Sequence, residues 1–239
     1  MWCSGVKGTM TPDSTPRTDA RVSLVACHIG VTAAFLLGCA APLARADACG
    51  NPLSSQIANS CVVSKDVLWR GAKPDVAAAT ELVNRGVRTV VNLELAHDDR
   101  EAFRDARPSV SQPQEIEYFR IRDWEPNVVL ASGLLDRHVA EFIAITRSQP
   151  KPIYVHCRSG QNRTGVMVAA YRVLEENQPI DSAVAEMAGY QGIWFKEDAE
   201  YIRQLAGERA ARLRAMAAER VKTLRAQTHL VCTSAGCRP

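Results

Sequence analysis

The sequence predicts an α/β fold in which a central, mostly parallel sheet of four or five strands is flanked by helices. Short β-branched and apolar segments alternate with helical segments, and this order is typical of parallel sheets with helices on both faces. The segment at 87–93 (VRTVVNL) has the composition of a buried strand. With 46% hydrophobic and 23% charged residues, the 239-residue chain has enough apolar side chains to bury such a core.

The elements of the first half follow from apolar periodicity and from capping residues. Asp75 is positioned to cap a helix over 76–85, which Gly86 ends. Residues 97–107 are rich in charge and predict a short exposed helix or loop. Strands are predicted at 67–70, 87–93 and 116–121.

The second half is predicted to be mainly helical. Ser132 caps a helix whose apolar side chains recur at helical spacing from Leu135 to Thr146. Pro150 and Pro152 separate this helix from a short strand. That strand lies at 153–156, and further helices are predicted at 164–176, 180–188 and 197–225.

The N-terminal 46 residues have the features of an export signal. Residues 22–44 carry no charge, Arg17 and Arg21 precede them, and an A-x-A site follows at 44–46. We expect cleavage after this site and an exported protein, either periplasmic or secreted. The two alternatives are a lipoprotein anchored through Cys39 and an uncleaved membrane anchor formed by the apolar run.

Charge and cysteine counts narrow the partners and the compartment. Lys and Arg number 29 and Asp and Glu number 26, and a net charge of +3 argues against a nucleic-acid-binding protein. After removal of the signal, five cysteines remain, and an odd number leaves one thiol over in an oxidising compartment. These five are Cys49, Cys61, Cys157, Cys232 and Cys237.

The segment at 156–165 reads His-Cys-Arg-Ser-Gly-Gln-Asn-Arg-Thr-Gly and carries most of the chemical information. A predicted strand ends at His156, a seven-residue loop follows, and a helix begins at Thr164. The backbone N–H groups of such a loop curl into a nest for an anion, and the helix N-terminus behind it adds a positive dipole end. We therefore predict a phosphate-binding loop made of Arg158, Ser159, Gly160, Gln161, Asn162 and Arg163.

Three side chains of this segment are suited to phosphoryl transfer. Arg163 presents a planar fork that matches two phosphate oxygens. The positive field of the loop favours the thiolate form of Cys157, which is the nucleophilic form. Thr164 is placed to donate a hydrogen bond to the sulfur and help it leave in a second step. This chemistry needs no metal and no cofactor.

The segment resembles the signature of the cysteine-dependent protein tyrosine phosphatases, Cys-x5-Arg-[Ser/Thr], with the usual His before it and Gly after it. The segments at 68–74 (LWRGAKP) and 86–93 (GVRTVVNL) resemble the opening of the dual-specificity-type phosphatases, closest to their atypical branch. The resemblance implies a phosphatase domain at 67–206. It would follow a signal or anchor at 1–46 and a tail at 47–66, and precede a C-terminal helix and tail at 207–239.

This family also uses an aspartate, on a loop after a strand and upstream of the cysteine, as general acid and then general base. Asp123 fits, because it lies 34 residues before Cys157 and a proline at position 126 closes its loop. Glu125 is the alternative acid. Trp124 either lines the cleft or anchors the loop.

The remaining polar candidates are predicted to lie outside the chemistry. His97, Asp98 and Asp99 lack a second cluster with which to bind a metal, and the two aspartates are expected to be solvated. His138 has apolar neighbours on its helix and is expected to pack or to lie on the surface. The Ala- and Arg-rich stretch at 208–225 is expected to be a solvated helix.

Taken with the resemblance, these features predict a phosphomonoester hydrolase with a Cys157 thiophosphate intermediate, either a protein tyrosine or a dual-specificity phosphatase. An inositol phosphate or phospholipid phosphatase is one alternative, although the loop lacks the internal lysines typical of relatives acting on inositol phosphates or phosphoinositides. A rhodanese-like sulfurtransferase is the other alternative, although its loop usually has one residue fewer. We expect a monomer acting on a phosphorylated protein or a small phosphomonoester.

The four cysteines other than Cys157 are expected to form two disulfides. Cys232 and Cys237 are close enough in sequence to close a tight loop, and Cys49 and Cys61 flank a polar stretch that allows the same. Alternatively the N-terminal pair bonds to the C-terminal pair, so three pairings remain open. In each case the bridges are expected on tails outside the catalytic core.

Overall fold

The computed structural model describes residues 49, 51–190 and 192–239. The predicted signal or anchor at 1–46, with Cys39 and the apolar run at 22–44, lies outside the described residues. Among the residues that are described, no helix has the length and apolar character needed to span a membrane.

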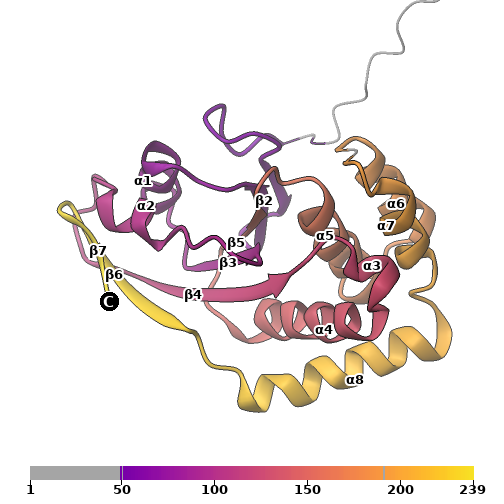
Figure 1. Cartoon of the computed structure of the whole chain (residues 1–239). Coiled ribbons are helices and arrows are strands. Elements are labelled where there is room, and N and C mark those ends of the chain that lie inside the picture. Colours follow the sequence, from indigo (N-terminus) through magenta and orange to yellow (C-terminus); the bar gives the residue numbers. More distant parts are fainter. Residues whose placement is uncertain (1–48, 50, 191) are drawn as a thin grey trace, which may run out of the picture. The chain divides into compact units, whose positions relative to one another are not determined.

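A seven-stranded sheet forms the centre of the described structure (Figure 1). Its strands are β1 (Cys61–Ser64), β2 (Leu68–Ala72), β3 (Thr89–Glu94), β4 (Gln114–Asp123), β5 (Ile153–Cys157), β6 (Thr228–Thr233) and β7 (Gly236–Arg238). They lie in the order β1-β2-β5-β3-β4-β6-β7, and the four inner strands are parallel while the outer three are antiparallel. The predicted α/β class is confirmed, but the sheet is mixed and has more strands than the four or five predicted.

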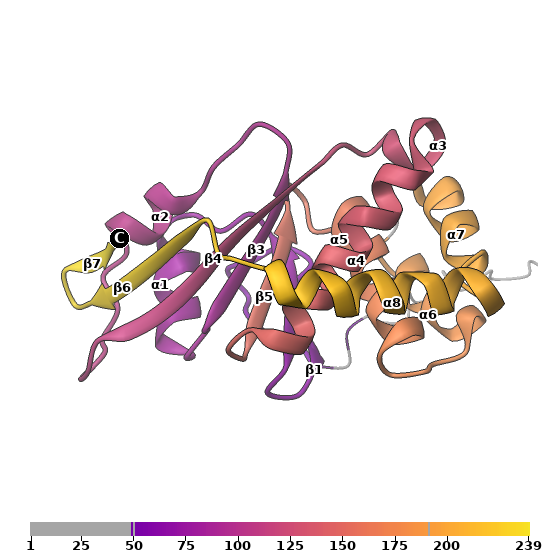
Figure 2. The same cartoon turned by 90° about the horizontal axis from the view of Figure 1, so that it is seen from below.

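Helices cover both faces of the sheet (Figure 2). They are α1 (Val76–Asn84), α2 (Arg100–Asp105), α3 (Asn127–Leu130), α4 (Ser132–Ser148), α5 (Asn162–Leu174), α6 (Ile180–Ala188), α7 (Phe195–Arg203) and α8 (Gly207–Thr223). Successive residues of the inner strands face opposite layers, as the pleat requires. Val90 and Tyr154 pack with α1 and α2, whereas Val91 and Val155 pack with the layer that contains α4 and α5.

Most predicted elements are present with shifted ends. Asp75 caps α1 as predicted, because its carboxylate accepts a hydrogen bond from a backbone N–H of the first turn at 2.8 Å. Ser132 does not cap α4; it is the first residue of that helix, and Ala131 takes the cap position without a side-chain hydrogen bond. The helix predicted at 197–225 is two helices, α7 and α8, because Ala206 between them is extended.

The segments expected to be tails contribute strands to the sheet. Strand β1 lies in the predicted tail at 47–66 and pairs with β2, and β6 and β7 form a hairpin beside β4. In β6 the side chains of Leu230 and Cys232 are buried and their neighbours are partly exposed, which is the pattern of a strand with one covered face. The alternation spans only six residues after a long helix, so the sequence analysis assigned it to a tail.

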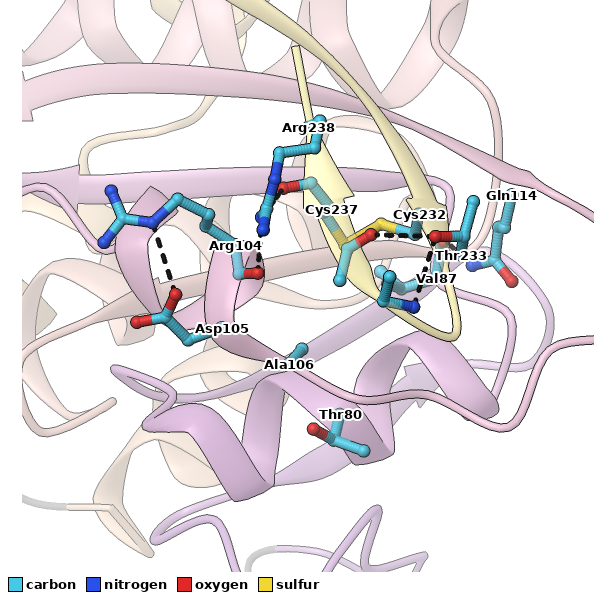
Figure 3. The surroundings of a disulfide bond; sticks show 12 residues. Thr80, Val87, Arg104, Asp105, Ala106, Gln114, Cys232, Thr233, Cys237 and Arg238 are labelled. Atoms are coloured by element: carbon cyan, nitrogen blue, oxygen red, sulfur yellow. Dashed lines mark hydrogen bonds and ion pairs between the residues drawn. A yellow bond between two sulfur atoms is a disulfide. The ribbon is translucent and has the colours of Figure 1, made fainter.

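Two disulfides form within the N-terminal and C-terminal cysteine pairs, Cys49–Cys61 and Cys232–Cys237, and Cys157 is the free cysteine of the described residues. The expected place of the bridges is wrong, because three of the four bonded cysteines lie on strands of the sheet. The C-terminal bridge joins two facing residues of the β6–β7 hairpin (Figure 3). Arg238 fastens this hairpin to α2, since its Nη1 donates to the carbonyl oxygen of Arg104 at 2.7 Å.

We expect the double variant Cys232→Ala/Cys237→Ala to have a free energy of unfolding lower by roughly 2 kcal/mol, which is the loop-closure entropy of so short a bridge. Turnover should stay near that of the parent, because β3 and β4 separate the hairpin from β5. Urea denaturation of the oxidised full chain measures the change. A variant as stable as its parent would show that this bridge does not stabilise the fold.

Candidate active site

The inner parallel strands end together at one edge of the sheet. They end at Ala72 on β2, Glu94 on β3, Asp123 on β4 and Cys157 on β5. Open α/β sheets bind ligands at this carboxyl edge. The fold therefore brings the predicted nucleophile and the predicted general acid to the same edge, with β3 between their strands.

The loop after Cys157 is shorter than predicted. Strand β5 includes Cys157 and α5 begins at Asn162, so the loop consists of residues 158–161. Gly160 makes its turn with a φ of +73°, and a Cβ at this position would lie 2.6 Å from the backbone of Gly71. Both the backbone conformation and the close approach to β2 require glycine here.

Three consecutive carbonyl groups of the loop are held from one side. The donors are Lys73 N–H to Arg158 O (3.3 Å), Asn59 Nδ2 to Ser159 O (2.8 Å) and Arg70 Nη2 to Gly160 O (2.6 Å). In a trans peptide the N–H of the next residue points away from the carbonyl. The N–H groups of Ser159, Gly160 and Gln161 therefore point to the other side and form the concave array of donors typical of an anion nest.

Arg70 on β2 is a site residue that the sequence analysis missed. It is fully buried, and its guanidinium lies 3.5 Å from the centre of the Tyr190 ring. Burial lowers the pKa of Arg70, while Tyr190 and Cys157 are among the groups whose electrostatic effect opposes this. An arginine stays charged in proteins, so a buried cation lies behind the loop and within electrostatic reach of the thiol.

Arg163 ties the first turn of α5 to the ends of two strands. Its Nη1 donates to Leu93 O at 3.0 Å and to Asp123 O at 3.2 Å, and its Nη2 pairs with Glu125 Oε1 at 2.8 Å. Its Nε is buried and has no partner within the described part of the chain. The guanidinium is thus fixed in orientation and keeps one donor for an anion.

Cys157 and Thr164 are both buried at the base of the site. The Thr164 hydroxyl has no hydrogen-bond partner among the residues that the structure describes. The predicted hydrogen bond from this hydroxyl to the Cys157 sulfur is therefore not formed here, and the hydroxyl remains a buried donor beside the loop.

The Asp123 carboxylate is buried and contacts two side chains. Asn127 Nδ2 donates to its Oδ1 at 3.0 Å, and His138 Nδ1 lies 2.9 Å from the same oxygen. The prediction that His138 only packs or lies on the surface is wrong in this respect. His138, which lies on α4, contacts Asp123, the predicted general acid. Its side chain is 14% exposed, so it connects the buried carboxylate to solvent.

The two residues after Asp123 lie nearer the surface. The Glu125 carboxylate pairs with Arg163, as described above, and its side chain is 29% exposed. Trp124 is 48% exposed. An indole this exposed is not a buried anchor of the loop, so its ring is available to a ligand at the carboxyl edge.

Asp99 belongs to a buried polar network behind β5. The prediction that Asp99 is solvated is therefore wrong. Asp99 is 2% exposed, and its Oδ2 lies 2.9 Å from Nε2 of His156, the residue before Cys157. Its Oδ1 accepts hydrogen bonds from Asn92 and from the Tyr118 hydroxyl. Burial acts to raise the pKa of Asp99, but His156 and the Tyr118 hydrogen bond hold it at about 2. An ionised carboxylate therefore fixes the ring of the residue that precedes Cys157.

A further carboxyl group, Asp198 on α7, faces the loop and was not predicted. Asp198 is 3% exposed, and its Oδ2 accepts a hydrogen bond from Asn162 Nδ2 at 3.2 Å. Burial raises the pKa of Asp198 to about 7. Repulsion from Asp123, Glu197 and Glu125 adds to this rise, and the hydrogen bond from Asn162 opposes it. A carboxyl group that holds a proton near neutral pH thus lies beside the phosphate-binding loop.

We expect Asp198→Asn to raise the free energy of unfolding by up to about 4 kcal/mol at about pH 8.5 and to leave it unchanged near pH 4. Asp198 in the unfolded chain ionises near its ordinary value of 3.8, so the cost to the folded state is absent below that pH. The free-energy cost of the buried charge grows as the pH rises to about 7, the pKa of Asp198 in the folded protein, and is constant above that pH. Urea denaturation at several pH values measures this, and parallel stability curves for variant and parent would contradict it.

The chemistry available at this edge is that of N–H donors, one thiol and several carboxyl groups. The loop amides and Arg163 can bind a tetrahedral anion, Cys157 can attack it, and a carboxyl group can move a proton. Within the described residues, no three His, Cys, Asp or Glu side chains are grouped so as to hold a metal ion.

Comparison with known proteins identifies a family and curated relatives. Residues 52–200 match the family described as "DSP-PTPase phosphatase fused to NAD+ Kinase". The dual specificity protein phosphatase TpbA of Pseudomonas aeruginosa is 29% identical over 161 residues, which cover 66% of this chain and 67% of TpbA.

The solved structures that share the fold include two phosphatases. The crystal structure of P. aeruginosa TpbA has a TM-score of 0.54 and 23% identity, and the match covers 73% of this chain and 99% of that one. The core catalytic domain of the PP-IP phosphatase SIW14 from S. cerevisiae has a TM-score of 0.52 and 17% identity, covering 75% of this chain and 99% of that one. At these identities the likeness concerns the fold.

Proposed function

The chain belongs to the DSP-PTPase family of cysteine-dependent, dual-specificity-type phosphatases, and from this premise we propose that it removes phosphate from singly phosphorylated tyrosine side chains of proteins. The observation that carries the proposal is the loop after Cys157. Its carbonyl groups are held from one side, its amides point to the other, and Arg163 is fixed beside them.

The proposed reaction has two steps. The loop amides and Arg163 bind the phosphate, the Cys157 thiolate attacks phosphorus, and the bond to the tyrosine oxygen breaks as Asp123 gives that oxygen a proton. Water then attacks the thiophosphate, Asp123 takes a proton from the water, and the sulfur–phosphorus bond breaks to release inorganic phosphate. Thr164 donates a hydrogen bond to the sulfur as it leaves.

The contacts of the two candidate acids favour Asp123. Glu125 pairs with Arg163 at 2.8 Å, so its carboxylate is already engaged with the guanidinium. Asp123 contacts an amide and the ring of His138 instead. We propose that Asn127 and His138 hold this carboxyl group in place for both proton transfers, which together return Asp123 to its starting state.

The charges around the loop support a substrate with a single phosphate. Asp123 and Glu125 lie close enough to Asp198 for their negative charges to raise its pKa. The positive charge of Arg163 is already paired with Glu125. Further phosphate groups would meet like charges here. An uncharged phenyl ring meets the half-exposed Trp124 instead, and aromatic pairs add to binding.

We also propose that the protein acts outside the cytoplasm. Two disulfides support this, because such bonds persist in oxidising compartments. The apolar run at 22–44 and the A-x-A site at 44–46 support export by a cleaved signal. Anchoring through the lipidated Cys39 or through an uncleaved run is the alternative.

We expect Asp123→Asn to slow hydrolysis of phenyl phosphate by roughly 10²–10³-fold, the usual range for loss of a general acid. The loss should shrink for p-nitrophenyl phosphate, because its leaving group needs no proton. Steady-state kcat with both substrates measures the difference.

Glu125→Gln is the matched control for this prediction, since it removes the other carboxylate of the same loop. The leaving-group dependence should be absent from this variant. If Glu125→Gln shows the dependence and Asp123→Asn does not, Glu125 is the acid.

The proposed function is tested with the full chain and a panel of substrates in the presence of EDTA. We expect a phosphotyrosine peptide to have the highest kcat/KM, ahead of phosphoserine peptides, inositol phosphates and phosphoinositides, with vanadate as an inhibitor. A preference for inositol phosphates would overturn the proposed substrate. Activity restored only by adding a divalent metal would overturn the mechanism.

A further inference from the structure

Helix α7 meets the start of α5 through a polar contact beside the phosphate-binding loop. Asp198 on α7 accepts the side-chain hydrogen bond of Asn162, which is the first residue of α5 and directly precedes Arg163. Asn162 also meets Gly192, where a Cβ would lie 2.1 Å from its Oδ1. The Asn162 amide is therefore confined by a backbone segment and by a buried carboxyl group.

Negative charge dominates the surroundings of Asp198. The elements packed around it carry the acidic residues Asp123 and Glu125 before α3, Asp136 and Glu141 on α4, Asp181 and Glu186 on α6, and Glu197 and Glu200 on α7. They also carry the basic residues Arg137, His138 and Arg147 on α4, Arg163 and Arg172 on α5, and Lys196 and Arg203 on α7. Arg163 pairs with Glu125, and Arg172 pairs with Glu186. The groups that raise its pKa besides burial are all carboxylates.

Resting on the proposed function, we propose that Asp198 is a positioning residue for the phosphate-binding loop, and that it acts in its uncharged form. It holds Asn162, and through Asn162 the first turn of α5 on which Arg163 lies. The protonated carboxyl still accepts the hydrogen bond from Asn162 and adds no charge beside a bound phosphate dianion.

Ionisation of Asp198 changes the charge of the site more than its shape. The carboxylate keeps the hydrogen bond to Asn162 but adds a negative charge to those of Asp123 and Glu125. Because the pKa of Asp198 is about 7, phosphate binding should weaken as the pH rises through this value. The effect should fall mainly on KM, since the charge repels the substrate before any bond is broken.

The test compares Asp198→Asn, Asp198→Ala and the wild type in the full chain. Asparagine keeps the acceptor oxygen without the charge, and alanine loses both. Glu200→Gln is the matched control, because it removes an exposed carboxylate from the same helix. We measure kcat and KM for p-nitrophenyl phosphate between about pH 5.5 and pH 8.5, using this substrate because its leaving group makes little demand on the general acid.

We expect the ratio of kcat/KM between Asp198→Asn and the wild type to be near one at the acid end and to rise roughly tenfold at the alkaline end, through KM. Taking this ratio at each pH removes the ionisation of the substrate itself. Asp198→Ala should lie below Asp198→Asn at every pH, and Glu200→Gln should follow the wild type. A ratio that does not change with pH, or the same change in Glu200→Gln, would overturn the inference.

A binding measurement separates this inference from the proposed function. Tungstate is a tetrahedral dianion that is not turned over, and its Kd can be measured calorimetrically in the Cys157→Ser background. Its affinity should fall between about pH 6 and pH 8.5 in that background and stay constant when Asp198→Asn is added. Equal pH dependence in both chains would refute the role of Asp198, whereas absence of hydrolysis by the wild type would refute the proposed function alone.

Discussion

Replacing Cys157 by serine is expected to stop turnover and to leave phosphate binding in place. The variant should lose roughly 10⁴-fold or more in kcat, as enzymes do when the nucleophile is removed. A serine hydroxyl is a far weaker nucleophile than a thiolate. The loop amides and Arg163 are untouched, and they supply the donors for the anion.

Two measurements on one preparation check this expectation. Hydrolysis of a phosphotyrosine peptide reports the chemistry, and calorimetric binding of tungstate reports the state of the loop. Binding lost together with turnover would mean that the serine has disturbed the loop rather than removed a nucleophile. Near-normal turnover in Cys157→Ser would remove Cys157 from the mechanism.

Arg163→Lys is expected to lower kcat/KM by roughly 10²–10³-fold, the range for loss of a group that stabilises transition-state charge. Lysine keeps the positive charge, so the loss measures the geometry of the guanidinium. The side chain contacts three groups at once, Leu93 O, Asp123 O and the Glu125 carboxylate, and Nε is left for the substrate. A single ammonium group cannot make these contacts together.

Arg85→Lys is the matched control for this variant, because Arg85 lies on the surface beside α1 and pairs only with Glu81 among the interactions described for it. Its activity should equal that of the wild type. Arg163→Lys should also melt at a lower temperature, since two strand ends lose a donor. An Arg163→Lys variant with unchanged kcat/KM would show that the guanidinium group is not needed to bind the phosphate.

The sequence was sufficient for the parts of the fold that depend on local pattern. The apolar run at 87–93 predicted a buried strand, and β3 covers its last five residues and Glu94 after them. Asp75 predicted the start of α1 because a helix cap is a contact within one turn. The loop after Cys157 could be found because its function depends on residues that are consecutive in the chain.

The polar residues around the site could not be predicted in this way. Asp99, His138 and Asp198 lie in charged or amphipathic segments, where a titratable side chain has the same local pattern whether it faces water or a buried partner. Their partners lie on other elements, as the contact between α7 and the start of α5 illustrates. Arg70 lies in the segment at 68–74, which resembles the opening of dual-specificity-type phosphatases. Only its tertiary hydrogen bond to Gly160 O shows that it supports the loop after Cys157.

The most direct test of the account is to trap the intermediate. Wild-type enzyme turning over a phosphotyrosine peptide is quenched with acid, digested and examined by mass spectrometry. The proposed mechanism predicts one phosphoryl group on the peptide that contains Cys157, present during turnover and absent from Cys157→Ser. A phosphoryl group on any other residue, or none on this peptide while substrate is being hydrolysed, would contradict it.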